Sequence, residues 1–347
     1  MNCFSLRVGK KVLVTLTQGD LKFPMNLRRY FLAATLLIII NKGQFLSQEI
    51  SFLPTSASNV VAHFGDSDAA STDLIVNVDL VNVPFTVRDG GGRLVTEVDP
   101  GYLRIYEDNQ LQAIRNFSRE VNLPLTIGLL VDTSNSIRER WSFERATAQE
   151  FLNKTIKAGH DSAFLMSFDS RIRLIQDYTD DPVQLAGALC QLRPSGATKL
   201  FDAVVQACQD KMAPVEGRKV LIIISDGDDN ASLLNLRKAL KTAQNHDVLI
   251  YSVSTNPYVS CDKHLDKPDK ILRSLALETG GQAFFPTTTQ EFARSFESIS
   301  AELRSQFSLA YNSTNARRDG VFRKIRIVSD QKKWVVRTRK GYFAPTG

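Results

Sequence analysis

Residues 125–136 read LTIGLLVDTSNS, an uninterrupted apolar run that ends in a short polar segment. An apolar run without alternation is typical of a strand buried on both faces of a parallel sheet. Residues 220–229, VLIIISDGDD, repeat this pattern further along the chain. The two segments therefore predict two central strands, each with acidic and hydroxyl side chains at its carboxyl end.

Helical and strand patterns alternate around these two runs. Helices are predicted over residues 142–157, 183–192, 200–212, 232–244, 269–279 and 290–305. Further strands are predicted over residues 163–168, 172–175, 248–253 and 283–285. This alternation is typical of a doubly wound α/β fold, in which helices cover both faces of a mostly parallel sheet. Ligands of such sheets bind outside the carboxyl ends of the strands.

Both flanks of this region have the two-residue period of antiparallel strands. Strands are predicted over residues 73–87, with a break in phase at Leu80 and Val81, and over 102–106, 111–114, 307–311, 322–328 and 334–337. We expect one small antiparallel β domain, built from residues 72–122 and 307–343. The α/β domain, residues 123–306, is then an insertion. Such an insertion disturbs the β domain little, because the ends of a compact insert lie close together.

The positive charge of the chain is concentrated at its start. Residues 1–47 hold seven Lys and Arg against one Asp, which accounts for the whole net charge of +6. The remaining residues are balanced in charge, so we expect no nucleic-acid partner. Lys324 and Arg326 alternate with Ile325 and Ile327. That alternation favours a solvated sheet face over a site for an anionic surface.

The first 47 residues have the pattern of a secretory leader. Arg28 and Arg29 precede a ten-residue apolar segment, residues 31–40, which is shorter than the roughly 20 residues that span a bilayer. We expect a signal peptide here, with an uncleaved membrane anchor as the alternative and Met25 as an alternative start. A linker follows over residues 48–71. The protein is thus expected to be exported, and to be extracellular, periplasmic or envelope-associated.

Three cysteines, Cys190, Cys208 and Cys261, follow the leader, and their spacing fits no Cys-x-x-Cys pattern. Cys190 and Cys208 lie in apolar helical patterns, which predicts buried thiols. A disulfide between the two remains an alternative in an oxidising compartment.

Five oxygen-bearing residues are expected at the carboxyl edge of the sheet. Asp132, Ser134 and Ser136 follow the first apolar run, Asp226 follows the second, and Thr198 ends the segment SGAT between them. Two carboxylates and three hydroxyls form a hard donor set that suits Mg²⁺, Mn²⁺ or Ca²⁺ rather than Zn²⁺. The alternative role for the 132–136 segment is to cap the helix that follows it.

This pattern resembles the von Willebrand factor A fold and its metal-ion-dependent adhesion site. Residues 192–203 resemble the Thr-bearing loop of that family, and residues 217–229 resemble the strand that carries its second Asp. The flanking segments 81–89, 102–110 and 310–342 resemble the acidobacterial-type VWA-related domain proteins, a group of exported bacterial proteins. Ala197 stands where the family more commonly has a second Gly.

The resemblance implies a role for each of the five residues. Ser134 and Ser136 would ligate the metal through their hydroxyls, and Thr198 would do so directly or through water. Asp132 and Asp226 would act mainly through bridging waters. One coordination position would stay open for a carboxylate of a partner protein.

The predicted function is therefore an exported, divalent-metal-dependent protein-binding module for adhesion or assembly, and not an enzyme. No nucleophile elbow, phosphate-binding Gly-rich loop or Cys–His pair is present. Two alternatives stay open. The first is a metal-assisted hydrolase or phosphatase, with Asp228 as its candidate base. The second is a structural envelope component with an incidental metal site.

Three further acids near these loops have more than one interpretation. Asp228 and Asp229 are expected to favour the amino terminus of the helix that follows them, through its dipole. The alternative is that they extend an acidic rim or form a second cation site. Asp202 would either orient the Thr198 loop by a hydrogen bond or serve as a first-turn acid of its own helix.

Overall fold

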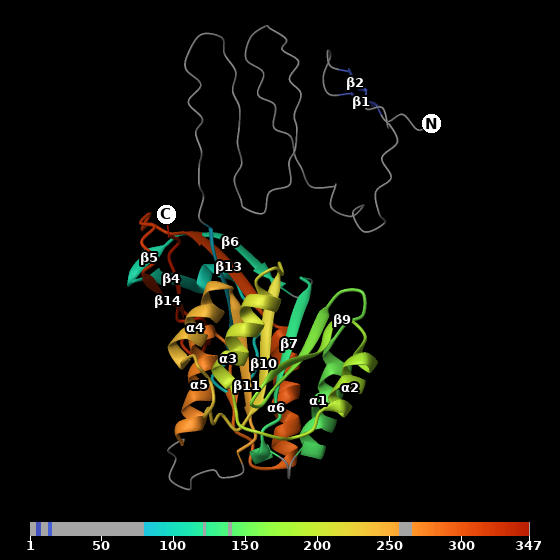
Figure 1. Cartoon of the computed structure of the whole chain (residues 1–347). Helices are drawn as coiled ribbons and strands as arrows, with labels where there is room; N and C mark the ends of the chain where they lie inside the picture. Colours follow the sequence, from blue (N-terminus) through green and yellow to red (C-terminus); the bar gives the residue numbers. More distant parts are fainter. Residues whose placement is uncertain are drawn as a thin grey trace, which may run out of the picture. The chain divides into compact units, whose positions relative to one another are not determined.

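The computed structural model describes residues 80–120, 123–137, 141–256 and 266–346, together with two short strands near the start of the chain (Figure 1). Those strands, β1 (Ser5–Arg7) and β2 (Leu13–Thr15), pair antiparallel. The remainder of the predicted leader, the 48–71 linker, the strand residues 73–79 and Cys261 lie outside the described residues. Within the described part, no helix is long and apolar enough to cross a bilayer.

The centre of the fold is a six-stranded sheet with the strand order β12-β11-β10-β7-β8-β9. Neighbouring strands are parallel except for β9, which runs antiparallel to β8. The strands are β7 (Leu125–Asp132), β8 (Ser162–Phe168), β9 (Ile172–Thr179), β10 (Arg218–Ser225), β11 (Val248–Ser254) and β12 (Ala283–Phe284). Every residue of β7 is buried, as its unbroken apolar run predicts. The predicted doubly wound, mostly parallel sheet is confirmed.

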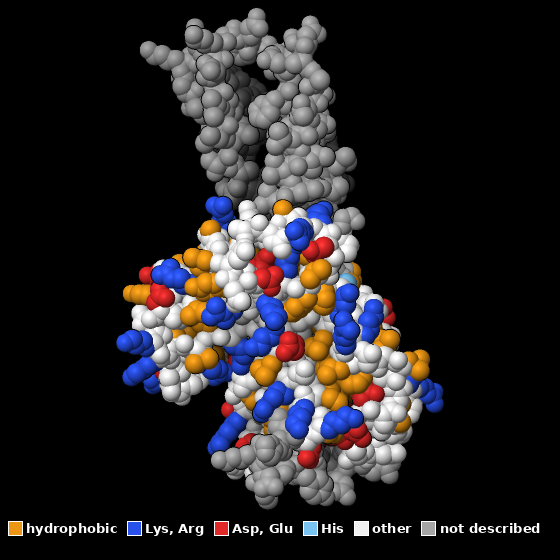
Figure 2. All heavy atoms as spheres, turned by 90° about the vertical axis from the view of Figure 1, so that its left-hand side faces the viewer, with side chains coloured by type: hydrophobic (Ala, Val, Ile, Leu, Met, Phe, Trp, Pro, Cys, Tyr) orange, Lys and Arg blue, Asp and Glu red, His pale blue; other side chains and the backbone are white. Residues whose placement is uncertain are grey.

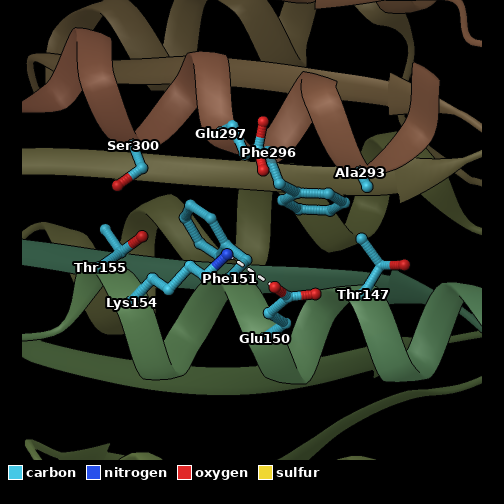
Figure 3. Close-up of a pocket in the computed structure, with 9 residues that line it drawn as sticks. All are labelled: Thr147, Glu150, Phe151, Lys154, Thr155, Ala293, Phe296, Glu297 and Ser300. Carbon is cyan, nitrogen blue, oxygen red and sulfur yellow. Dashed lines mark ion pairs between the residues drawn. The ribbon is translucent and has the colours of Figure 1, made fainter. Parts of the chain in front are cut away.

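Helices cover both faces of this sheet and enclose two separate apolar cores (Figure 1). One face packs against α1 (Trp141–Thr155), α2 (Pro182–Gln191) and α6 (Thr289–Leu303). The other packs against α3 (Leu200–Gln206), its π-helical continuation η5 (Ala207–Met212), α4 (Leu236–Asn245) and α5 (Lys267–Thr279). Between α1 and α6 the rings of Phe151 and Phe296 lie 5.1 Å apart at the floor of a shallow pocket (Figure 3).

The flanks form two four-stranded antiparallel sheets with the orders β15-β3-β13-β6 and β16-β14-β4-β5. Each sheet combines strands from before and after the α/β region, so the α/β region is an insertion in the antiparallel part. The strands are β3 (Leu80–Arg88), β4 (Leu103–Glu107), β5 (Gln110–Gln112), β6 (Ile114–Arg119), β13 (Phe307–Asn312), β14 (Phe322–Ser329), β15 (Val335–Thr338) and β16 (Gly341–Phe343). In β14, Ile325 and Ile327 are buried while Lys324 and Arg326 are exposed, as the alternation predicts.

Arg218 joins the α/β region to the antiparallel part. It is the first residue of β10, and its guanidinium donates to the carbonyl of Glu120 at 3.0 Å, to Gln306 Oε1 at 2.6 Å and to the carbonyl of Leu303. The amino ends of the central strands therefore face the antiparallel sheets. Their carboxyl ends lie at the opposite edge, about 25 Å away along an eight-residue strand.

Several local predictions were wrong. Helix α4 begins at Leu236 rather than at residue 232, because the preceding residues are held against α3. Strands β6 and β16 were not predicted as separate strands. Cys190 is exposed rather than buried, because it faces outward near the end of α2; Cys208 is buried, and both thiols are free.

Candidate metal centre

The site begins where β7 and β10 end side by side. The register pairs Val131 with Ile224, so Asp132 and Ser225 leave the sheet next to each other. Ser225 Oγ donates to Asp132 Oδ2 at 2.6 Å, and it accepts the backbone N–H of Gly227 at 3.0 Å. No role was predicted for Ser225. The structure shows that this hydroxyl orients the first acid of the set.

Asp132 is completely buried. Its Oδ1 accepts the backbone N–H of Ser134 at 2.8 Å, which folds the start of the loop into a tight turn. Burial raises the pKa of Asp132 to about 6; hydrogen bonds from Ser225 and Ser134 oppose this rise, and the negative charge of Asp226 adds to it. No Lys or Arg of the described residues pairs with this carboxylate. A buried acid of this kind is stabilised by a cation from solution.

Two hydroxyls follow on the same loop. Ser134 Oγ and Ser136 Oγ lie 2.9 Å apart. Ser134 is 2% exposed, whereas Ser136 is exposed to solvent. The pair therefore extends from the turn beside the buried carboxylate to the surface.

The loop that carries Thr198 is tied to this first loop by its backbone. Ser195 donates its N–H to the carbonyl of Thr133 at 2.6 Å, and Asn135 donates its N–H to the carbonyl of Gly196 at 3.3 Å. Gly196 has a φ of +80°, and a Cβ there would lie 2.6 Å from Ser170 Oγ, so glycine is required. Ala197 is not among the residues with positive φ, which explains why it is tolerated in place of Gly.

The third loop, which follows β10, locks Thr198 from the other side. Asn230 Oδ1 accepts the N–H of Thr198 at 2.9 Å, and Ala231 donates its N–H to the carbonyl of Thr198 at 3.0 Å. Asp226, half-buried, opens this loop, and its Oδ1 accepts the N–H of Asp228 at 3.1 Å. The hydroxyl of Thr198 makes no hydrogen bond within the described residues, so it is free to act as a ligand.

Asp229 and Asp202 form contacts between elements, and Asp202 is also a first-turn acid of its own helix, which was one of its two predicted roles. Asp229 Oδ2 accepts the N–H of Phe201 at 2.9 Å, so it caps α3 rather than α4. The residue before α3, Lys199, supplies no side-chain cap of its own. Asp202, in the first turn of α3, accepts the N–H groups of Leu233 at 3.1 Å and Leu234 at 2.9 Å. It therefore anchors the loop after β10, not the Thr198 loop.

The donor set distinguishes this site from a zinc or di-metal carboxylate centre. Across the described residues there is no group of three or more His, Cys, Asp or Glu side chains that could hold a metal. What the three loops provide is two carboxylates and three hydroxyls. Hydroxyl and carboxylate oxygens are ligands for hard divalent ions, and the uncompensated carboxylate of Asp132 adds the charge such an ion needs. The residues present fit a divalent cation.

Comparison with known proteins bears on the same segment. Residues 127–228 match the family model of the von Willebrand factor type A domain. The chain contains a von Willebrand factor type A domain. The match begins in β7 and ends in the loop after β10, so it includes the segments that carry all five predicted ligands. A search of curated proteins found no match.

Solved structures of several proteins are similar to this chain. A D319A mutant of the PilB minor pilin from Streptococcus sanguinis is 10% identical with a TM-score of 0.44, over 53% of this chain and 62% of the pilin. The chain thus spans less than two thirds of that protein. BatB from Bacteroides thetaiotaomicron is 15% identical with a TM-score of 0.43, over 52% of this chain and 97% of BatB. Proximal thread matrix protein 1 from the mussel byssus, with a zinc-occupied MIDAS motif, is 16% identical with a TM-score of 0.46, over 57% and 50%.

Proposed function

We propose that this von Willebrand factor type A domain binds partner proteins through a divalent cation held by Asp132, Ser134, Ser136, Thr198 and Asp226. One observation carries the proposal. Three loops that are distant in sequence are locked together by backbone hydrogen bonds around a buried carboxylate that has no cationic partner among the described residues. Burial of an unpaired carboxylate costs free energy, and a bound cation would offset that cost.

The mixture of ligands supports binding of an acidic partner. Ser134, Ser136 and Thr198 are neutral, so a divalent ion at this site keeps positive charge that two carboxylates do not fully neutralise. When bound, the ion supplies an open position for a carboxylate oxygen. We propose Mg²⁺ as the resident ion, with Mn²⁺ or Ca²⁺ as substitutes, and an Asp or Glu side chain of a partner protein as the group that is bound.

We propose binding rather than catalysis at this site. Hydrolysis would need a positioned base or nucleophile beside the ion. Asp228, the candidate base, is exposed, and none of the described residues donates a hydrogen bond to its carboxylate. The structural alternative, an envelope component with an incidental ion, differs from our proposal because its contacts would not depend on the cation.

Export belongs to the same proposal. The leader pattern of residues 1–47 supports delivery outside the cytoplasm, with the apolar segment either cleaved or retained as an anchor. A metal-dependent binding domain on the envelope or outside the cell would then meet its protein partners there.

A peptide-display selection tests the binding function. One library of random peptides has a fixed central Asp, and a matched library has Asn at the same position. We expect the full-length chain to recover peptides from the Asp library in millimolar Mg²⁺, few from the Asn library, and none after chelation with EDTA. Asp226→Ala should lose this recovery, whereas Asp228→Ala, which removes the same charge from the same loop, should keep it. Equal recovery from both libraries would contradict the proposal.

A further inference from the structure

Two leucines on the loop that follows β10 are exposed to solvent. Leu233 is 89% exposed and Leu234 is 37% exposed. They precede Asn235, the residue that caps α4. Leu233 is the most exposed large apolar side chain of the described residues. Folding therefore leaves its apolar surface in water, where it gains nothing from the core.

The backbone that carries these leucines is fixed. Leu233 and Leu234 both donate their N–H groups to the carboxylate of Asp202, at 3.1 Å and 2.9 Å. Just before them, Ser232 Oγ donates to Asp229 Oδ2 at 2.6 Å, and the N–H of Asp202 donates to Ser232 Oγ at 3.1 Å. A side chain presented by an anchored loop loses little conformational entropy when a partner covers it, so it is well suited to binding.

The same loop holds the proposed ligand Thr198. Asn230 and Ala231, three and two residues before Leu233, both donate N–H groups to the carbonyl of Thr198. Asp202 lies four residues after Thr198, in the first turn of α3. The exposed leucines and the proposed metal ligand are thus attached to the same helix start at the same sheet edge.

The residues after the leucines are basic. Helix α4 has three charged side chains, Arg237, Lys238 and Lys241, all exposed and all positive. Among the described residues none of them forms an ion pair, and Lys241 instead lies 4.8 Å above the ring of Phe343. Figure 2 looks at the molecule from the side of α4 and α5, and shows Lys and Arg spread over this face. This charge complements an acidic partner.

We infer that Leu233 and Leu234 form an apolar anchor beside the proposed metal site. This anchor selects partner segments that carry an apolar side chain at a fixed distance from the acid that binds the metal. It also favours segments with further acidic residues, which would face the basic side chains of α4. The inference rests on the proposed function and specifies its partner. The carboxylate supplies dependence on the cation, and the contact with Leu233 supplies selectivity, because buried apolar contacts beside a polar anchor dominate many protein interfaces.

The Asp-library selection tests this inference when it is repeated with Leu233→Ser. The matched control is Val183→Ser, which removes a side chain that is 75% exposed at the start of α2. That helix follows the end of β9, which pairs with the amino end of β8 and so lies at the opposite sheet edge. We expect wild type and Val183→Ser to enrich an apolar residue at one spacing from the Asp, and Leu233→Ser to lose that enrichment.

Affinities for one enriched peptide give the quantitative result. The peptide should bind Leu233→Ser about tenfold more weakly than wild type and Val183→Ser equally well, while all three chains bind Mg²⁺ alike. Mg²⁺-dependent recovery without any apolar preference, or an unchanged affinity of Leu233→Ser, would overturn the inference and leave the proposed function standing. Recovery that needs Leu233 but persists in EDTA would overturn the proposed function and leave the anchor standing. No recovery at all would overturn both.

Discussion

Ser225 and Asp132 are joined across the ends of two parallel strands by a hydrogen bond of 2.6 Å, from Ser225 Oγ to Asp132 Oδ2. Both side chains are buried. This contact leaves Asp132 with one oxygen held by a hydroxyl and the other held by the N–H of Ser134. The orientation of the acid is therefore decided by the β7–β10 register, before any ion or partner is considered.

Removal of that hydroxyl should weaken metal binding without removing a ligand. Ser225→Ala frees Asp132 Oδ2, and loss of a group that orients a ligand typically costs about tenfold or more in affinity. Ser252→Ala is the matched control, because it removes a buried strand hydroxyl that donates to the carbonyl of Leu272. Titration calorimetry with Mg²⁺ should show the loss only in Ser225→Ala. Equal losses in both variants would assign the effect to general destabilisation.

Asp229 should stabilise the fold through α3. Its carboxylate accepts the N–H of Phe201 and the hydroxyl of Ser232. Asp229→Ala therefore removes the cap of α3 and a hydrogen bond that holds the loop after β10. We expect a loss of about 1–2 kcal/mol in the free energy of unfolding, measured by urea denaturation. The exposed neighbour Asp228 provides the comparison, and Asp228→Ala should change stability by less than about 0.5 kcal/mol.

Glu302 should be the most sensitive acid at the junction of the two parts. This completely buried residue near the end of α6 pairs with Arg88 at 2.9 Å, pairs with Arg337, and accepts the hydroxyl of Tyr251 at 2.6 Å. Glu302→Gln leaves two half-buried arginines without their shared, completely buried counter-charge, which should cost about 3–5 kcal/mol in the free energy of unfolding. Urea unfolding of Glu297→Gln, an exposed acid on the same helix, should match wild type. Similar stabilities of the two variants would contradict this role.

Asp161 should make the fold sensitive to acid. Burial alone would raise the pKa of Asp161, but hydrogen bonds from Arg304, His160 and the backbone of Lys157 outweigh it and lower the pKa. The stabilisation is therefore fully present above the unfolded-state pKa of about 3.9, and it is lost as the pH falls through the lower pKa of the folded state. Between these two pKa values, the melting temperature should fall more steeply with decreasing pH in wild type than in Asp161→Asn. Identical slopes would mean that other groups control acid unfolding.

Much of the architecture could be predicted from local pattern. The apolar runs of β7 and β10 have no polar face and are short and rich in branched residues, which favours buried strands, and the alternation around them identified the doubly wound sheet. The start of α4 could not be predicted in this way. A helix tolerates the side chains of residues 232–235, but Asp202 accepts the N–H groups of Leu233 and Leu234 in a tertiary contact. Asp229 accepts the N–H of Ser232 in a local one, and together these hydrogen bonds hold the segment out of the helix.

The residue types of the candidate site could be predicted, but the residues that orient its side chains and hold its loops could not. Position after a buried strand is a local signal, so Asp132 and Asp226 could be placed at one edge. The roles of Ser225, Asn230 and Asp229 depend on which loops meet in space, and no spacing along the chain shows this. Cys190 illustrates the same limit, because an apolar helical neighbourhood does not reveal which side of the helix is covered.

The most direct test of the account is isothermal titration of Mg²⁺, and then Mn²⁺, into the full-length chain and its Asp132→Ala and Asp228→Ala variants. Thr198→Ala, which removes a hydroxyl without a hydrogen bond among the described residues, provides a second variant if Asp132→Ala fails to fold. We expect saturable binding at one site in wild type and Asp228→Ala, and its loss in Asp132→Ala and weakening in Thr198→Ala. Heats in Asp132→Ala equal to those of wild type, or no binding heat in wild type, would contradict the central claim that these loops hold a divalent ion.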